Sequence, residues 1–119
     1  MLKLKRAYEK PSPDAGERIL VDRLWPRGLK KEEAHLDDWL KELAPSDELR
    51  HWFAHDPERW EEFQQRYIEE LEESDNKSPI EELRQKARQG PVTLVFAAKD
   101  EEKNNAVVLK KFLEERLGS

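Results

Sequence analysis

Three stretches of the chain carry the hydrophobic patterns of β-strands. Residues 2–8 alternate apolar and basic side chains, which is typical of a strand with one face in water, and the lysines favour a sheet edge. Residues 18–25 and 92–98 instead contain short continuous apolar runs, a pattern consistent with strands that are buried on both faces. We therefore expect one edge strand and two buried strands.

Between the second and third of these strands, apolar residues recur with the spacing of amphipathic helices. The pattern predicts a helix over residues 36–44, and Ser46 is placed to cap a second helix over residues 46–55. Asp56, followed by a proline, is a typical start for a third helix. The apolar stripe of this third helix consists of Trp60, Phe63, Tyr67 and Leu71.

Two further helices are indicated by the residues at their ends. Residues 78–81, Ser-Pro-Ile-Glu, match a capping box, in which serine and glutamate satisfy free backbone amides at a helix start. That helix is expected to end at Gly90, because glycine and the following proline form a stop signal. Residues 106–117 predict a final helix, with Gly118 at its stop.

The order of these elements indicates the fold class. Two strands, several helices, a strand and a helix imply an α/β fold, because strands joined by a helical crossover pair in parallel. We expect a single small domain over residues 1–119, with a short, mainly parallel central sheet of about three strands flanked by four or five helices. The orientation of the first strand stays open, because the loop that follows it holds no obvious helix.

Composition and charge narrow the possible functions. The chain has a net charge of -5, which argues against non-specific attraction to DNA or to an anionic membrane as its main role. It has no cysteine, so disulfides, thiol catalysis and thiolate zinc sites are excluded. The chain has no long apolar stretch, so we expect no signal peptide and no membrane span. A cytoplasmic location is expected.

Polar and aromatic side chains follow both buried strands. In open α/β sheets, ligands bind beyond the carboxyl ends of parallel strands, where the loops converge. If the two strands are parallel, the residues that follow them face one crevice. Those after the apolar run within residues 18–25 are Asp22, Arg23, Trp25 and Arg27, and those after the second buried strand are Lys99, Asp100, Asn104 and Asn105.

The chemistry of these residues favours an anionic ligand. Arginine supplies a planar fork of donors, lysine a point charge and asparagine an amide, so a phosphorylated or nucleotide-like molecule is expected. If the protein is an enzyme, Asp22, His55 and Asp100 are the candidate proton-transfer groups. The predicted ligand-binding residues are Arg23, Trp25, Arg27, Lys99, Asn104 and Asn105. In the competing structural interpretation, the charges pair with one another, Trp25 fills the core edge and an asparagine caps the last helix.

Other types of site receive weaker support. His51 and His55 have a spacing that suits a shared metal ion, but no HExxH motif is present and no metal site is expected. The standard phosphate-binding glycine motifs are also missing, so no cofactor is expected. The oligomeric state stays open.

Two alternatives to ligand binding are a protein-interaction module and nucleic-acid binding. The interaction module would use an exposed apolar patch around Trp25. Nucleic-acid binding is the weaker alternative. It would require one face to gather Lys3, Lys5, Arg6, Arg23 and Arg27.

Three blocks of the sequence resemble a known family. They are "ILVDRLWPRG", "KELAPSDELRHWFAHDPERWEEFQQRY" and "GPVTLVFAAKDEEKNNAVVLKKFL", and together they are similar to the YeaO-like family of small bacterial proteins of unknown function. The resemblance covers almost the whole chain and implies a small cytoplasmic α/β domain, without an established substrate. More distant relatives have Cys and His after the last strand. This chain has Ala97, Ala98, Asn104 and Asn105 there, which argues against a thiol-based activity.

Overall fold

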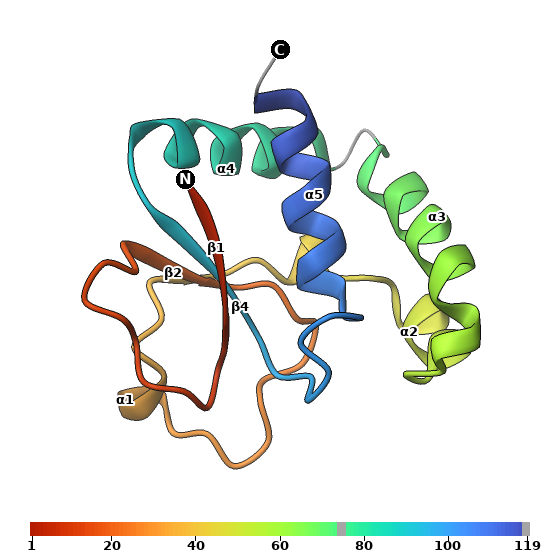
Figure 1. The fold of residues 1–119 in the computed structure, drawn as a ribbon, viewed down its shortest axis with the longest axis horizontal. Coiled ribbons are helices and arrows are strands. Elements are labelled where there is room, and N and C mark those ends of the chain that lie inside the picture. The colour runs from red at the N-terminus through yellow and green to blue at the C-terminus, as the bar shows by residue number, and fades with distance from the viewer. Residues whose placement is uncertain (74–75, 118–119) are drawn as a thin grey trace.

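A parallel four-stranded sheet lies at the centre of the computed structural model, which describes residues 1–73 and 76–117 (Figure 1). Its strands are β1 (Leu2–Arg6), β2 (Glu17–Leu20), β3 (Asp38–Trp39) and β4 (Val92–Phe96). The helices are α1 (Lys31–Ala34), α2 (Asp47–Phe53), α3 (Trp60–Leu71), α4 (Lys77–Gln89) and α5 (Asn105–Leu117), with short 3-10 helices at Lys41–Leu43 and Pro57–Arg59. None of the helices in the described ranges has the length and apolar character needed to cross a membrane.

The strands are arranged in the order β1-β4-β2-β3, and every pair is parallel. This arrangement confirms the α/β class and the edge position of the first strand, and it settles that strand's orientation. In the middle of the sheet, Leu94 of β4 lies between Leu4 of β1 and Ile19 of β2. The carboxyl ends of β2 and β4 therefore lie next to each other, as the predicted crevice requires.

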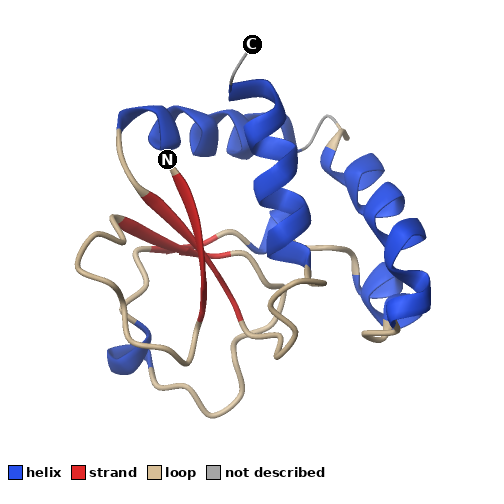
Figure 2. Cartoon of the chain, viewed as in Figure 1, coloured by secondary structure: helices blue, strands red, loops and turns tan. Residues whose placement is uncertain are grey.

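One face of the sheet is covered by helices (Figure 2). Because side chains alternate along a strand, Leu94 and Phe96 of β4 point to this face, as does Ile19 of β2. They pack with the apolar stripes of the helices, including Phe63 and Tyr67 of α3, in the main core of the protein. The stripe predicted for the third helix is thus part of that core, although Trp60 is only partly buried.

The opposite face of the sheet is covered mainly by loops. Leu20 of β2 and Val95 of β4 point to this face and form a small second cluster with Ala7. Side chains from β3 and from the segment between β2 and β3 complete the cover. These are Trp25, Leu29, Leu36 and Trp39. The loop that follows β2 is therefore part of the protein's packing and not a free surface loop.

The helix expected over residues 36–44 is wrong. The segment forms β3 and a single 3-10 turn, and the backbone amide of Leu40 donates to the carbonyl of Leu20 on the neighbouring strand. Packing of Leu36 and Trp39 against the loop-covered face of the sheet overrides their helical spacing. This extra strand raises the expected three strands to four.

The helix ends agree only in part with the sequence signals. Ser46 caps α2, because its hydroxyl oxygen accepts a hydrogen bond from the amide of Leu49, and Gly90 ends α4. The capping box at residues 78–81 is wrong, since α4 already begins at Lys77 and Ser78 lies inside it. The expected stop at Gly118 lies outside the described residues.

Candidate functional site

A cavity of about 610 Å³ lies beyond the carboxyl ends of β2 and β4. Its walls come from the loops after these two strands, from the start of α5 and from the region of α2. The predicted ligand-binding residues and the candidate proton-transfer groups all line this one cavity. They are Asp22, Arg23, Trp25, Arg27, His55, Lys99, Asp100, Asn104 and Asn105.

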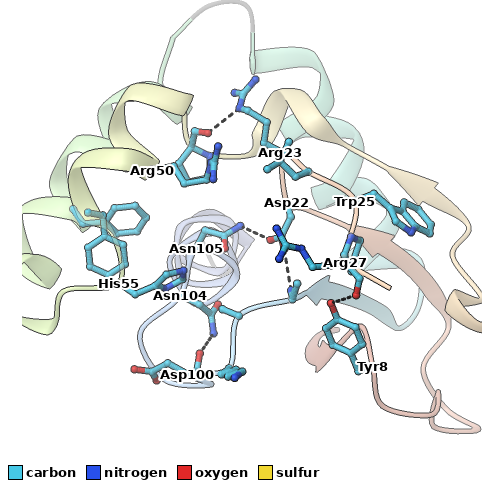
Figure 3. A pocket seen from close by; sticks show the side chains of 18 residues that line it. Tyr8, Asp22, Arg23, Trp25, Arg27, Arg50, His55, Asp100, Asn104 and Asn105 are labelled. Atoms are coloured by element: carbon cyan, nitrogen blue, oxygen red, sulfur yellow. Dashed lines mark hydrogen bonds between the residues drawn. The ribbon is translucent and has the colours of Figure 1, made fainter. Parts of the chain in front are cut away.

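Asp22 links the two strand ends at the base of this site. Its Oδ2 accepts a hydrogen bond from the backbone amide of Ala97 at 2.9 Å, and its Oδ1 accepts one from the side-chain amide of Asn105 at 3.1 Å (Figure 3). The same amide of Asn105 donates to the carbonyl of Val21 at 3.0 Å. One carboxylate and one amide therefore hold β2, the end of β4 and the start of α5 in fixed positions.

The surroundings of Asp22 alter its acidity. Burial raises the pKa of the Asp22 carboxyl above its ordinary value, because a buried charge loses its hydration. The hydrogen bonds from Ala97 and Asn105 favour the ionised form and partly offset this effect, as do the charges of His55 and Arg50. Because both of its oxygens already accept hydrogen bonds, Asp22 is a positioning group for the backbone and not a free base.

Arg23 and Trp25 line the cavity but have partners within the fold. The Nε of Arg23 donates to the carbonyl of Pro45 at 3.0 Å, and a second guanidinium nitrogen donates to Ala44. The indole Nε1 of Trp25 donates to the carbonyl of Leu29 at 2.7 Å, and the ring packs edge-on against Trp39. In both residues, most polar groups of the side chain are therefore hydrogen-bonded within the fold, as the structural interpretation expects.

Asn104 and Asp100 shape the loop that leads into α5. Asn104 is 2% exposed, and its side-chain oxygen accepts from the amide of Val107, as an N-cap does, while its amide donates to the carbonyl of Asp100. The Oδ1 of Asp100 accepts from the amides of Lys103 and Glu102, and these bonds lower the pKa of Asp100. Asn104 therefore caps the last helix, as the structural interpretation expects of one asparagine, whereas Asn105 joins the two strand ends.

Arg27 and Lys99 are the cations of the cavity with uncommitted charged groups. Both residues are exposed. In the described ranges, the guanidinium of Arg27 and the ammonium group of Lys99 form no hydrogen bond and no ion pair. The backbone carbonyl of Arg27 accepts from the hydroxyl of Tyr8, which fixes the loop at its base. A ligand at this rim would meet two cations that the fold leaves available.

His55 reaches the cavity from the end of α2. Ala54 and His55 both adopt the left-handed conformation, with φ of 46° and 57°, and the imidazole lies 5.9 Å from the ring of Phe53. His51 does not line the cavity, so the two histidines do not act on it together. Within the described ranges, no group of three or more His, Asp or Glu side chains is placed to hold a metal ion.

The wall of the cavity that α2 and α3 contribute was not predicted from the sequence. Arg50, Phe53 and Phe63 line the cavity, and the Nε of Arg50 is enclosed without a hydrogen-bond partner. Arg50 also donates to Asp47 at 3.2 Å. The available signal was the three-residue spacing of Arg50 and Phe53, which places both on the same side of a helix.

Comparison with known proteins identifies the family. The family model described as "Inactive DUF488-N3 subclade" matches residues 1–119. The chain is also 39% identical to the uncharacterized protein YeaO of Escherichia coli over 112 residues, 94% of this chain and 96% of YeaO. The chain belongs to the YeaO-like family. Uncharacterized proteins of Mycobacterium tuberculosis and Mycobacterium bovis are each 42% identical to this YeaO-like chain over 115 residues, 97% of it and 95% of theirs.

No solved structure matches this YeaO-like protein, so its site is interpreted from its own geometry. Four permanent cations line the cavity, from Arg23, Arg27, Arg50 and Lys99, against the two carboxyl groups of Asp22 and Asp100. Asp47 pairs with both Arg23 and Arg50, so the three carboxylates leave an excess of one positive charge in a chain whose net charge is -5. The arrangement can attract an anion, while the carboxylates hold the backbone that surrounds it.

Proposed function

We propose that this YeaO-like protein binds a small anionic ligand, such as a phosphate ester or a nucleotide-like molecule, in the cavity beyond β2 and β4. The observation that carries the proposal is the pair of uncommitted cations, Arg27 and Lys99, on two loops that meet at one cavity. Hydrogen bonds to charged groups typically contribute about 1.5–3 kcal/mol each, so contacts to both cations would add a substantial part of the free energy of ligand binding.

The size of the cavity supports an organic ligand. Its volume of about 610 Å³ lies within the range of roughly 300–1,000 Å³ that is common for small-molecule sites. An inorganic ion would fill a small part of this space. The rest of the ligand would lie against the mainly apolar lining of the cavity, to which Leu24, Pro26 and Phe53 contribute.

Binding without catalysis is the form of the proposal that the residues support best. Both oxygens of Asp22 accept hydrogen bonds within the fold, and Asp100 holds the loop before α5. Two of the three candidate proton-transfer groups are therefore engaged in structure, which leaves His55. The family description also contains the word "inactive". We therefore propose a ligand-binding role with no proton transfer by Asp22 or Asp100.

A thermal-shift screen with nucleotides and sugar phosphates tests this proposal. A ligand at 100 times its dissociation constant adds about 2.7 kcal/mol of stability, which is a clear rise in unfolding temperature. Lys99→Gln and Arg27→Gln are expected to reduce that rise. Lys111→Gln is the matched control, because Lys111 is an exposed lysine of α5 outside the cavity. No shift with any anion, or equal losses in Lys99→Gln and Lys111→Gln, would refute the proposal.

A docking role for the same loop is a second candidate, favoured by one observation. Leu24 is 58% exposed at the cavity rim, whereas Trp25, the residue expected to form an apolar patch, is half-buried against Trp39. A stoichiometric partner that is lost in Leu24→Ser, while the unfolding temperature is unchanged, would support this role.

Nucleic-acid binding gains no support from the contacts of its proposed residues. Lys3 pairs with Asp14, and Lys5 pairs with Glu9. Arg6 donates to the carbonyls of residues 97 and 98. Arg23 donates to the carbonyls of Pro45 and Ala44, so within the described ranges Arg27 alone of these five cations has an uncommitted side chain.

A further inference from the structure

The cavity has two chemically different sides. In the view of Figure 3, His55 lies next to two aromatic rings on one side of Asn105, and Arg27 lies on the other side. The aromatic side is built by Phe53 and by Phe63, whose rings are stacked at 4.3 Å. Phe53 and Phe63 are 5% and 2% exposed, so a ligand that fills the cavity would meet a small part of these rings beside the exposed His55 at one end, and a cation at the other.

His55 completes the aromatic side. Its imidazole is tilted by 51° against the ring of Phe53 and makes no hydrogen bond or ion pair with the residues that the structure describes. Histidine tolerates the left-handed backbone conformation better than most residues, so the turn after α2 can present this ring. Ring pairs prefer such tilted or offset arrangements, and a planar ligand group can add to them.

The cationic side lies on separate loops. Arg27 follows β2 and Lys99 follows β4, so their side chains approach the cavity from the sheet and not from α2. A ligand group that contacts both His55 and Arg27 must span the cavity.

From this division we infer that the ligand is an aromatic anion: a planar ring that lies against His55 and Phe53, joined to a phosphate or similar group that binds Arg27 and Lys99. The inference rests on the proposed function and adds the ligand class to it. It assigns the imidazole of His55 as a contact for the ring and the guanidinium of Arg27 as a contact for the anion.

Phenyl phosphate, methyl phosphate and benzyl alcohol separate the two parts of this inference. The two esters carry the same anionic group and differ in the ring, whereas benzyl alcohol has the ring and no charge. Titration of the full chain, followed by NMR, gives a dissociation constant for each. We expect phenyl phosphate to bind about tenfold more tightly than methyl phosphate, equivalent to about 1.4 kcal/mol.

Two variants assign the contacts. His55→Asn keeps a residue that accepts the left-handed conformation and removes the imidazole, so it should reduce the preference for phenyl phosphate about threefold or more. Arg27→Gln should weaken both esters by a similar factor, because it removes the anion's partner alone. Lys111→Gln should change neither constant.

The outcomes distinguish this inference from the proposed function. Equal affinities for the two esters, or a preference that His55→Asn leaves intact, would overturn the aromatic ligand class while anion binding stands. Failure of both esters to bind at millimolar concentration would overturn anion binding itself. Benzyl alcohol that binds as well as phenyl phosphate would have the same consequence, since the charge would then add nothing.

Discussion

The carboxylate of Asp22 and the backbone amide of Ala97 are joined by a hydrogen bond of 2.9 Å between segments that are 75 residues apart in the chain. The bond connects the second residue after β2 with the first residue after β4. Because these are the two central strands, it fixes the distance between the loops that carry Arg27 and Lys99. The base of the cavity is therefore set by the fold before any ligand arrives.

Asn105→Ala should destabilise the protein. The substitution removes the amide that donates to the carbonyl of Val21 and to Asp22, and leaves both acceptors without that donor. An unsatisfied buried polar group costs about 1–3 kcal/mol, so we expect a loss of that size in the free energy of unfolding, measured in urea. A loss no larger than that of the surface control Lys111→Gln would show that water replaces the amide at no cost.

Stability should depend on pH through Asp22. Burial raises the pKa of Asp22 above its ordinary value of 3.8, so the folded state holds this proton more tightly than the unfolded state does. The contribution of Asp22 to stability is complete below the unfolded value and is lost as the pH rises through the folded value.

Carboxyl NMR of the folded protein checks this sign. The Asp22 signal should titrate above 3.8, and Asn105→Ala should raise its pKa further, because the hydrogen bond from Asn105 favours the ionised form. Asp100 supplies an internal reference of opposite direction, since the amides of Lys103 and Glu102 lower its pKa. If Asp22 titrates below its ordinary value, the hydrogen bonds outweigh burial and the predicted sign is wrong.

Substitution by glutamine should affect stability at Arg23 and anion binding at Arg27. Arg23 donates to two backbone carbonyls next to α2, so Arg23→Gln should lower the free energy of unfolding by about 1–3 kcal/mol. Arg27→Gln should leave stability within about 0.5 kcal/mol and weaken anion binding, because its guanidinium has no partner in the described ranges. Urea unfolding together with phenyl phosphate titration of both variants measures the contrast. The reverse pattern would exchange the assigned roles.

Two glycines with left-handed backbones form a matched pair for a packing test. Gly16 has φ of 66°, and a Cβ there would overlap the backbone of Pro91 just before β4. Gly28 has φ of 77°, and no atom lies near its Cβ position. Gly28→Ala should cost about 1–2 kcal/mol from backbone strain alone, and Gly16→Ala should cost clearly more. Equal losses by thermal unfolding would mean that Pro91 moves away freely.

The sequence predicted the elements whose patterns are independent of distant contacts. The buried runs around Ile19 and Leu94 form the two central strands, and Ser46 caps its helix through local bonds. The error over residues 36–44 arose because the spacing of Trp39 and Leu40 suits a helix, while their packing and pairing partners lie on β2 and β4. Such long-range contacts leave no local signal.

The candidate site also has features that the sequence predicts and features that depend on distant packing. The rule for parallel strand ends predicted that the residues after both strands would face one crevice, and Asp22 and Asn105 are hydrogen-bonded there because their approach follows from topology. It could not separate Arg27 from Arg23, since the difference depends on carbonyls that α2 brings close. Phe63 was assigned to the core stripe alone, and its second position in the cavity wall depends on how α3 packs.

The covering of the second sheet face by Trp25 and its neighbours has a consequence for how the cavity can move. Trp25 packs with Trp39 over Leu20 and Val95, so swinging this loop away would expose the interior of the sheet to water. A hinged lid is therefore a poor description of the segment. A ligand would therefore enter a cavity whose wall is already rigid. Movement of the loop away from the sheet would be a local unfolding event, detectable as faster amide hydrogen exchange.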